Sequence, residues 1–102
     1  MALAFVRQDI SIPDGTGRRS INGTAAFGRD VRVADVAVNG FVLDYTSSDH
    51  HINIVEIDTD VVNVRGDIVE FRVECQYADK DFNDPYRGSV SILVIADTHD
   101  DR

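Results

Sequence analysis

Apolar and polar residues alternate most regularly over residues 67–77. The apolar positions are Val69, Phe71, Val73, Cys75 and Tyr77, and charged or amide side chains occupy the positions between them. Because successive side chains of a strand point to opposite faces, this stretch is predicted to be a strand with one face in a core and the other in water.

A second stretch, residues 89–96, starts with the same alternation and then becomes apolar at every position from Ile92 onward. A strand that is apolar on both faces is typical of an interior strand that is covered on both sides. We expect this strand to be the neighbour of the first one in a single sheet.

The remaining strand signals are shorter and are separated by turn residues. They predict strands at residues 3–6, 10–12, 20–27, 31–38, 41–45 and 52–57, with a short piece at 61–62 and turns at 58–60 and 63–67. A change of phase at Ala34 and Asp35 indicates a bulge. Asn39-Gly40 lies between two alternating runs, which predicts a tight hairpin turn, with one long kinked strand as the alternative.

No stretch carries an apolar stripe with the period of a helix, so an all-β antiparallel sandwich or barrel of about six to eight strands is predicted. The length of 102 residues fits a single domain over residues 1–102, with N-terminal strands and a loop at 1–30 and a frayed acidic tail at 97–102.

Charge and cysteine content narrow the possible partners. Eighteen acidic against ten basic side chains give a formal charge of −8, which excludes nucleic acid and anionic membranes as main partners. One cysteine, Cys75, allows no internal disulfide and is expected to be a buried thiol. No apolar run is long enough for a membrane span, and no signal peptide is recognisable, so a cytoplasmic location is the default expectation.

The acidic loop before the last strand has the spacing of calcium ligands. Asp79, Asp81 and Asn83 follow one another at every second position, as in the first half of an EF-hand loop. The EF-hand also needs Gly at the sixth position and a carboxylate at the twelfth, where this chain has Asp84 and Val90. An EF-hand is therefore excluded. Two alternatives remain for this loop, a looser calcium site and a solvated acidic loop. No cofactor is expected.

The loop with Ser47, Asp49, His50 and His51 contains the residue types of a hydrolytic triad or a zinc site. Neighbours in sequence rarely converge as a triad does, and two adjacent histidines on an extended chain point in opposite directions. A metal could bind there only where an oligomer axis brought copies together. The chain is therefore predicted not to be an enzyme.

From about residue 31 to 96 the order of features resembles the H-type lectin domain. The matching segments are 36–44 (Val-Ala-Val-Asn-Gly-Phe-Val-Leu-Asp), 52–54, the turn at Arg65-Gly66, the long strand 69–77, an Asp-containing loop, and 86–95, which begins with Tyr86-Arg87-Gly88. The resemblance implies a six-stranded antiparallel sandwich that assembles as trimers or pairs of trimers and binds N-acetylgalactosamine or related sugars. Tyr86 falls where a sugar-contacting tyrosine is expected.

The resemblance fails at two positions that bear on sugar binding. The family usually has a Trp at the end of the long strand, where this chain has Ala78, and an Arg that contacts sugar in some members would fall near Asn53. The carbohydrate site is therefore placed on Asp79, Asp81, Asn83 and Tyr86, whose oxygens and flat ring suit a pyranose. The alternative for Tyr86 is that it packs the loop against the core.

The sequence predicts a carbohydrate-binding homotrimer, or a multiple of it, without catalysis. The alternative is a structural domain that uses the same sandwich to assemble a larger particle.

Overall fold

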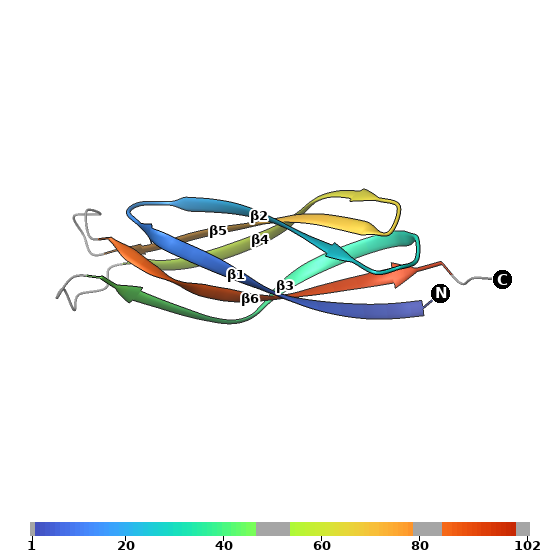
Figure 1. Cartoon of the computed structure of the whole chain (residues 1–102), viewed down its shortest axis with the longest axis horizontal. Coiled ribbons are helices and arrows are strands. Elements are labelled where there is room, and N and C mark those ends of the chain that lie inside the picture. Colours follow the sequence, from blue (N-terminus) through green and yellow to red (C-terminus); the bar gives the residue numbers. More distant parts are fainter. Residues whose placement is uncertain (1, 47–53, 79–84, 100–102) are drawn as a thin grey trace.

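The computed structural model describes residues 2–46, 54–78 and 85–99 (Figure 1). Its strands are β1 (Ala2–Gly15), β2 (Arg19–Ala26), β3 (Val31–Tyr45), β4 (Ile54–Arg65), β5 (Ile68–Ala78) and β6 (Tyr86–Thr98). The prediction of an all-β antiparallel fold is confirmed. Within the described ranges there is no helix that could cross a membrane.

The six strands form two antiparallel three-stranded sheets. Sheet I has the order β1-β6-β3 and sheet II the order β2-β5-β4. The two most regular strands of the sequence, β5 and β6, are thus the centres of different sheets, and the prediction that they are neighbours in one sheet is wrong. Alternation reports which side chains of a strand face a core, but it carries no information about which strand lies beside it.

The core lies between the two sheets and is made by alternate residues of the central strands. Fully buried side chains come from β5 (Val69, Phe71, Val73, Cys75) and from β6 (Tyr86, Val90, Ile92, Val94). The alternation predicted for β5 is confirmed. Gly23 on β2 pairs with Phe71, and a Cβ at Gly23 would lie 2.6 Å from the Phe71 ring, so the missing side chain makes room for this ring.

The turn predicted at Asn39-Gly40 is wrong, and the alternative of one long irregular strand is correct. β3 continues through this dipeptide, pairs with β6 along its length, and absorbs the irregularity as a register shift between Val38 and Gly40. The bulge predicted at Ala34 and Asp35 is also wrong, because the other register shift of β3 lies between Val31 and Val33. A partner strand as long as β6 offers backbone hydrogen bonds to all of β3, which a hairpin turn would forfeit.

Three other strands are longer than the sequence predicts. β1 joins the two short pieces into one strand, and β4 runs straight through the turn expected at residues 58–60. β6 continues to Thr98, whose hydroxyl donates to the Ala2 carbonyl oxygen at 3.1 Å, so the acidic tail begins later than residue 97. In each case a paired neighbour strand keeps a polar stretch extended.

The long strands produce an elongated sandwich. It measures 57 × 18 × 18 Å, with a radius of gyration of 16.0 Å, whereas a compact domain of this length has a radius of gyration of about 13 Å. Both termini lie at one end, called the terminal end, and the strand ends next to residues 47–53 and 79–84 lie at the other, called the loop end (Figure 1). Over residues 2–46, 54–78 and 85–99 the fold has only these two layers, so none of the described elements covers the outer face of either sheet.

Candidate functional site

Most of the site residues predicted from the sequence lie outside the residues that the structure describes. Asp79, Asp81 and Asn83 lie outside the described residues, between β5 and β6, and so do His50 and His51, between β3 and β4. The carbohydrate, calcium and histidine-metal hypotheses for these side chains therefore stay predictions. Tyr86 is described.

Tyr86 is part of the core in this structure. Its side chain has 0% exposure. Its hydroxyl donates to the carbonyl oxygen of Gly17 at 2.7 Å and lies 3.2 Å from the carbonyl oxygen of Cys75. Because Gly17 belongs to the turn between β1 and β2, the phenol joins that turn to the first residue of β6. Tyr86 therefore closes the loop end of the sandwich from inside.

The surroundings of Tyr86 keep its phenol protonated. Burial raises the pKa of Tyr86 above its usual value, and the hydrogen bond with the Cys75 sulfur, 3.7 Å away, raises this pKa further. The Arg19 guanidinium, 5.8 Å from the centre of the Tyr86 ring, lowers this pKa by a smaller amount. The phenol is thus a neutral hydrogen-bond donor at physiological pH.

Two further tyrosines pack beside Tyr86. The ring centres of Tyr77 and Tyr86 are 6.1 Å apart in an edge contact, and those of Tyr45 and Tyr77 are 4.6 Å apart. A ring without accessible surface offers no face to a sugar. The contacts of Tyr86 match the packing alternative that the sequence left open.

An acidic cluster that the sequence did not single out lies on the outer face of sheet II. Carboxylate oxygens of Asp58, Asp60 and Glu74 lie within 4.8 Å of one another. Arg18 is part of the same group, because it forms ion pairs with Glu74 (Nε to Oε2, 3.5 Å) and with Glu56. The arginine offsets part of the negative charge that would attract a hard cation such as calcium.

The rest of the outer face of sheet II is also polar. The central strand β5 points Glu70, Arg72, Glu74 and Gln76 outward, since its alternate residues are buried. A groove of about 270 Å³ on this sheet is lined by Asn22, Gly23, Thr24, Val62, Glu70 and Phe71. This face has the composition expected of a surface in water.

The outer face of sheet I differs, because large apolar side chains gather at its terminal end. Leu3, Phe5 and Val33 are exposed to 64%, 60% and 62%. Residues that pair directly across an antiparallel ladder share a face, so the strand register places these three beside the outward residues Leu93 and Ile95 of β6. We call these five residues the apolar patch.

The apolar patch explains the double-sided apolar pattern of residues 92–95. Sheet II covers Ile92 and Val94, while Leu93 and Ile95 face outward and are only partly buried. The sequence predicted that this strand is covered on both faces. Among the described residues of one chain, sheet II covers only the inner face. This pattern was the available sequence signal for the patch, and sequence reasoning did not extend it to Leu3, Phe5 and Val33.

A hollow of about 230 Å³ lies within the apolar patch. It is lined by Leu3, Val33, Ala34, Asp35, Ile95 and Asp97. Asp97 pairs across the sheet with both Leu3 and Val33, and its Oδ2 lies 4.0 Å from Nε of Arg32. Its other oxygen, Oδ1, is buried and accepts no hydrogen bond from any described residue. A carboxylate oxygen in that position is costly unless a donor reaches it.

Comparison with other proteins adds no assignment to these features. The six strands in two antiparallel sheets agree in number and class with what the H-type lectin resemblance implies, and membership of that family stays a prediction. No family model, no curated protein and no solved structure matches this chain.

Proposed function

We propose that this chain is a non-catalytic assembly module that associates with copies of itself through the outer face of sheet I. The observation that carries the proposal is the apolar patch, in which Leu3, Phe5 and Val33 are each at least 60% exposed. Contiguous exposed apolar patches larger than a few hundred Å² are rare on monomeric proteins and mark interaction sites. The outer face of sheet II provides the contrast within the same molecule, because its outward residues are mostly charged or polar, with Val62, which is 49% exposed, among them.

The size of the face supports a stable association. The sandwich is 57 Å long and 18 Å wide, so one outer face offers on the order of 1,000 Å², against about 800 Å² per partner in a specific interface of standard size. Covering the exposed parts of Leu3, Phe5 and Val33 contributes roughly 1–2 kcal/mol for each side chain. Two or more copies together gain enough to offset the loss of translational and rotational freedom on association.

The distribution of charge supports a second copy of the chain as the partner. The charged residues on the outer face of sheet I include Asp9, Asp35, Asp44, Asp97, Arg7 and Arg87, together with Arg32 at the register shift between Val31 and Val33. This face is therefore close to neutral, while the whole chain carries −8. Two such faces approach each other with little electrostatic repulsion.

Sedimentation equilibrium over a wide range of protein concentration tests the proposal. We expect a mass larger than one chain, and we expect Phe5→Asp to return the protein to a single chain without loss of its β-sheet circular dichroism. Asn22→Asp is the matched control, because it adds the same charge to an exposed position on the outer face of sheet II. A wild-type protein that stays a single chain at all concentrations would show that the proposal is wrong.

Carbohydrate binding at the loop end is the second candidate function. It is favoured by the agreement between the six-stranded sandwich and the architecture that the H-type lectin resemblance implies. The residues proposed for sugar contact are Asp79, Asp81 and Asn83, and the same resemblance implies a trimer. An assembly joined by the outer face of sheet I would present several such ends at once, which raises avidity.

A glycan array probed with calcium-supplemented protein of known mass tests this candidate. Binding to a defined epitope that Asp81→Ala abolishes, with the oligomeric mass unchanged, would support a lectin. The control is Asp60→Ala, which removes an exposed carboxylate from the outer face of sheet II. Absence of binding by a folded oligomer leaves assembly as the function.

A further inference from the structure

We propose that two copies of this chain pair face to face across a two-fold axis, with Arg7 of each copy entering the hollow beside Asp97 of the other. The pairing rests on the proposed function, because it uses the same face of sheet I. It adds the symmetry of the contact and the residues that fix its register.

The hollow has the chemistry of a site for an arginine side chain. Its walls include Leu3, Val33 and Ile95, which suit the aliphatic stem of an arginine. Asp97 also lines the hollow; its Oδ1 has no hydrogen-bond donor among the described residues, and its Oδ2 lies 4.0 Å from Nε of Arg32. A guanidinium supplies several N–H donors in a planar fork and can satisfy a carboxylate oxygen that is now unpartnered.

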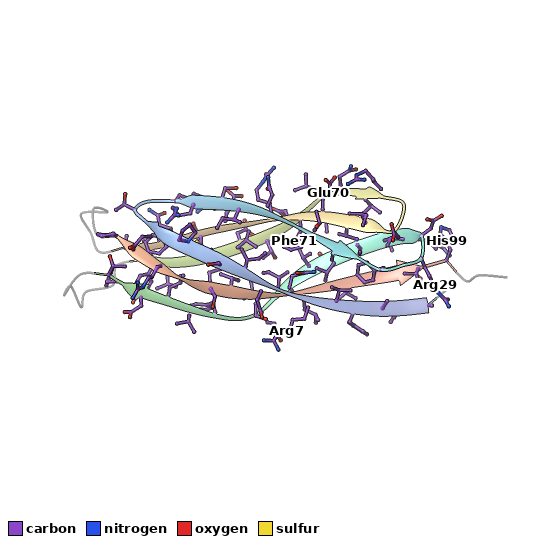
Figure 2. All side chains as sticks on the ribbon, viewed as in Figure 1. Arg7, Arg29, Glu70, Phe71 and His99 are labelled. Carbon is purple, nitrogen blue, oxygen red and sulfur yellow. The ribbon has the colours of Figure 1, made fainter. Side chains whose placement is uncertain are left out.

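Arg7 is an exposed arginine of sheet I that lies close to the apolar patch, since it pairs across the sheet with Leu93. It lies on β1 in the outward phase, and Figure 2 shows its side chain projecting away from the sandwich, on the side opposite Glu70. Its ion pair with Asp9 has an Nε to Oδ1 distance of 3.5 Å, and the two side chains are 64% and 67% exposed. An ion pair this exposed contributes little, so exchanging it for a contact in a desolvated hollow is favourable.

The strand register makes the face complementary to itself. Three neighbouring rows of outward residues cross sheet I, and each row contains one residue from β1, β6 and β3. They are Leu3–Asp97–Val33, Phe5–Ile95–Asp35 and Arg7–Leu93–Ala37.

The middle row is the position of the symmetry axis. Arg7 and Leu3 are four residues apart, or about 13 Å along the strand, and Phe5 lies halfway between them. A two-fold axis along the Phe5–Ile95–Asp35 row places the Arg7 row of one copy over the Asp97 row of the other, and the reverse. In such an isologous contact the interaction between Arg7 and the hollow forms twice, once in each direction.

The contacts at the axis and at its edge are consistent with this arrangement. Phe5 and Ile95 meet their own counterparts, which covers the largest exposed side chain of the apolar patch. Asp35 also meets its counterpart, but it is exposed on the edge strand β3 and accepts a hydrogen bond from the Val36 amide at 2.9 Å, so its charge stays in water. The charged groups that face the hollow are then Arg32, Asp35 and the incoming Arg7.

The mass of the assembly and a charge exchange test the pairing. We expect native mass spectrometry to give two chains, and we expect Arg7→Glu to weaken the association by about 30-fold or more. Asp97→Lys should weaken it similarly, and the double variant Arg7→Glu/Asp97→Lys should recover most of the loss, because the exchange restores opposite charges. Arg72→Glu is the control, since it reverses a charge on the outer face of sheet II and should leave the association unchanged.

The possible outcomes separate this pairing from the proposed function. A trimer that Phe5→Asp dissociates would overturn the two-fold pairing and leave the assembly function in place. A dimer that Arg7→Glu leaves intact would overturn the Arg7–Asp97 contact; this variant alone suffices if Asp97→Lys does not fold, because Arg7 is exposed. A single chain at every concentration would overturn both.

Discussion

Replacing Tyr86 by Phe tests whether the phenol closes the loop end from inside the core. The change keeps the ring and removes only the hydroxyl, which donates to Gly17 at 2.7 Å and lies 3.2 Å from the carbonyl oxygen of Cys75. The net contribution of one such hydrogen bond is about 1 kcal/mol, and an acceptor left in a partly buried position adds to the loss. We therefore expect Tyr86→Phe to lower the free energy of unfolding by about 1–2 kcal/mol.

The measurement is urea unfolding followed by far-ultraviolet circular dichroism, at one protein concentration for all variants because association also stabilises the fold. An unchanged m-value with a lower midpoint would locate the effect in stability. Tyr77→Phe is the matched control, since Tyr77 contacts Tyr86 through its ring, and we expect a change below about 0.5 kcal/mol. Tyr86→Ala should cost about 3–5 kcal/mol, because it also leaves a cavity.

A Tyr86→Phe variant as stable as wild type would refute the core role of the phenol. The tyrosine would then be available for the sugar contact that the H-type lectin resemblance implies. A destabilised Tyr86→Phe variant has a practical consequence for carbohydrate binding. Loss of glycan affinity in Tyr86→Ala would then report unfolding, and Asp81→Ala is the informative variant.

Three further predictions concern the core and its glycines. The raised pKa of Tyr86 means that its contribution to stability is complete below the unfolded value of 10.0 and is lost as pH rises above it; alkaline unfolding curves of wild type should therefore approach those of Tyr86→Phe above about pH 10. In thermal unfolding, Gly23→Ala should destabilise the fold by about 1–3 kcal/mol, because its Cβ would lie 2.6 Å from the Phe71 ring. Gly40→Ala is the control and should be neutral in the same measurement, because no atom lies within 4 Å of the added carbon. Gly88→Ala should cost at least about 3 kcal/mol, since its Cβ would lie 1.7 Å from a carbonyl oxygen of β3, and a melting temperature equal to wild type would contradict this packing.

The candidate sites were predictable from the sequence to different degrees. The acidic loop and the histidine pair were recognisable as residue types, but their placement depends on segments outside the described residues. Tyr86 illustrates the limit of a motif, because the same residue in a loop-Tyr-strand order can face a ligand or the core. Its direction is decided by Gly17 and Cys75, which approach it from the β1–β2 turn and from β5. The apolar patch was present in the sequence as the apolar pair Leu93 and Ile95, but its partners on β1 and β3 are remote in the chain.

The sequence by itself determined the local features of this protein. The period of two over residues 69–77 specified a half-buried strand, and the missing helical period specified the all-β class. These features depend on neighbours along the chain, because the direction of each side chain in a strand follows from its position in that strand.

Only the tertiary structure decided which strands pair and which faces remain uncovered. It placed β5 and β6 in opposite sheets, continued β3 through Asn39-Gly40 with a register shift, and turned Tyr86 inward. Each of these outcomes depends on backbone hydrogen bonds and contacts between residues distant in sequence, whose energies outweigh local turn preferences. The exposed patch around Phe5 follows from the same cause, since two layers of sheet can bury only one face of each.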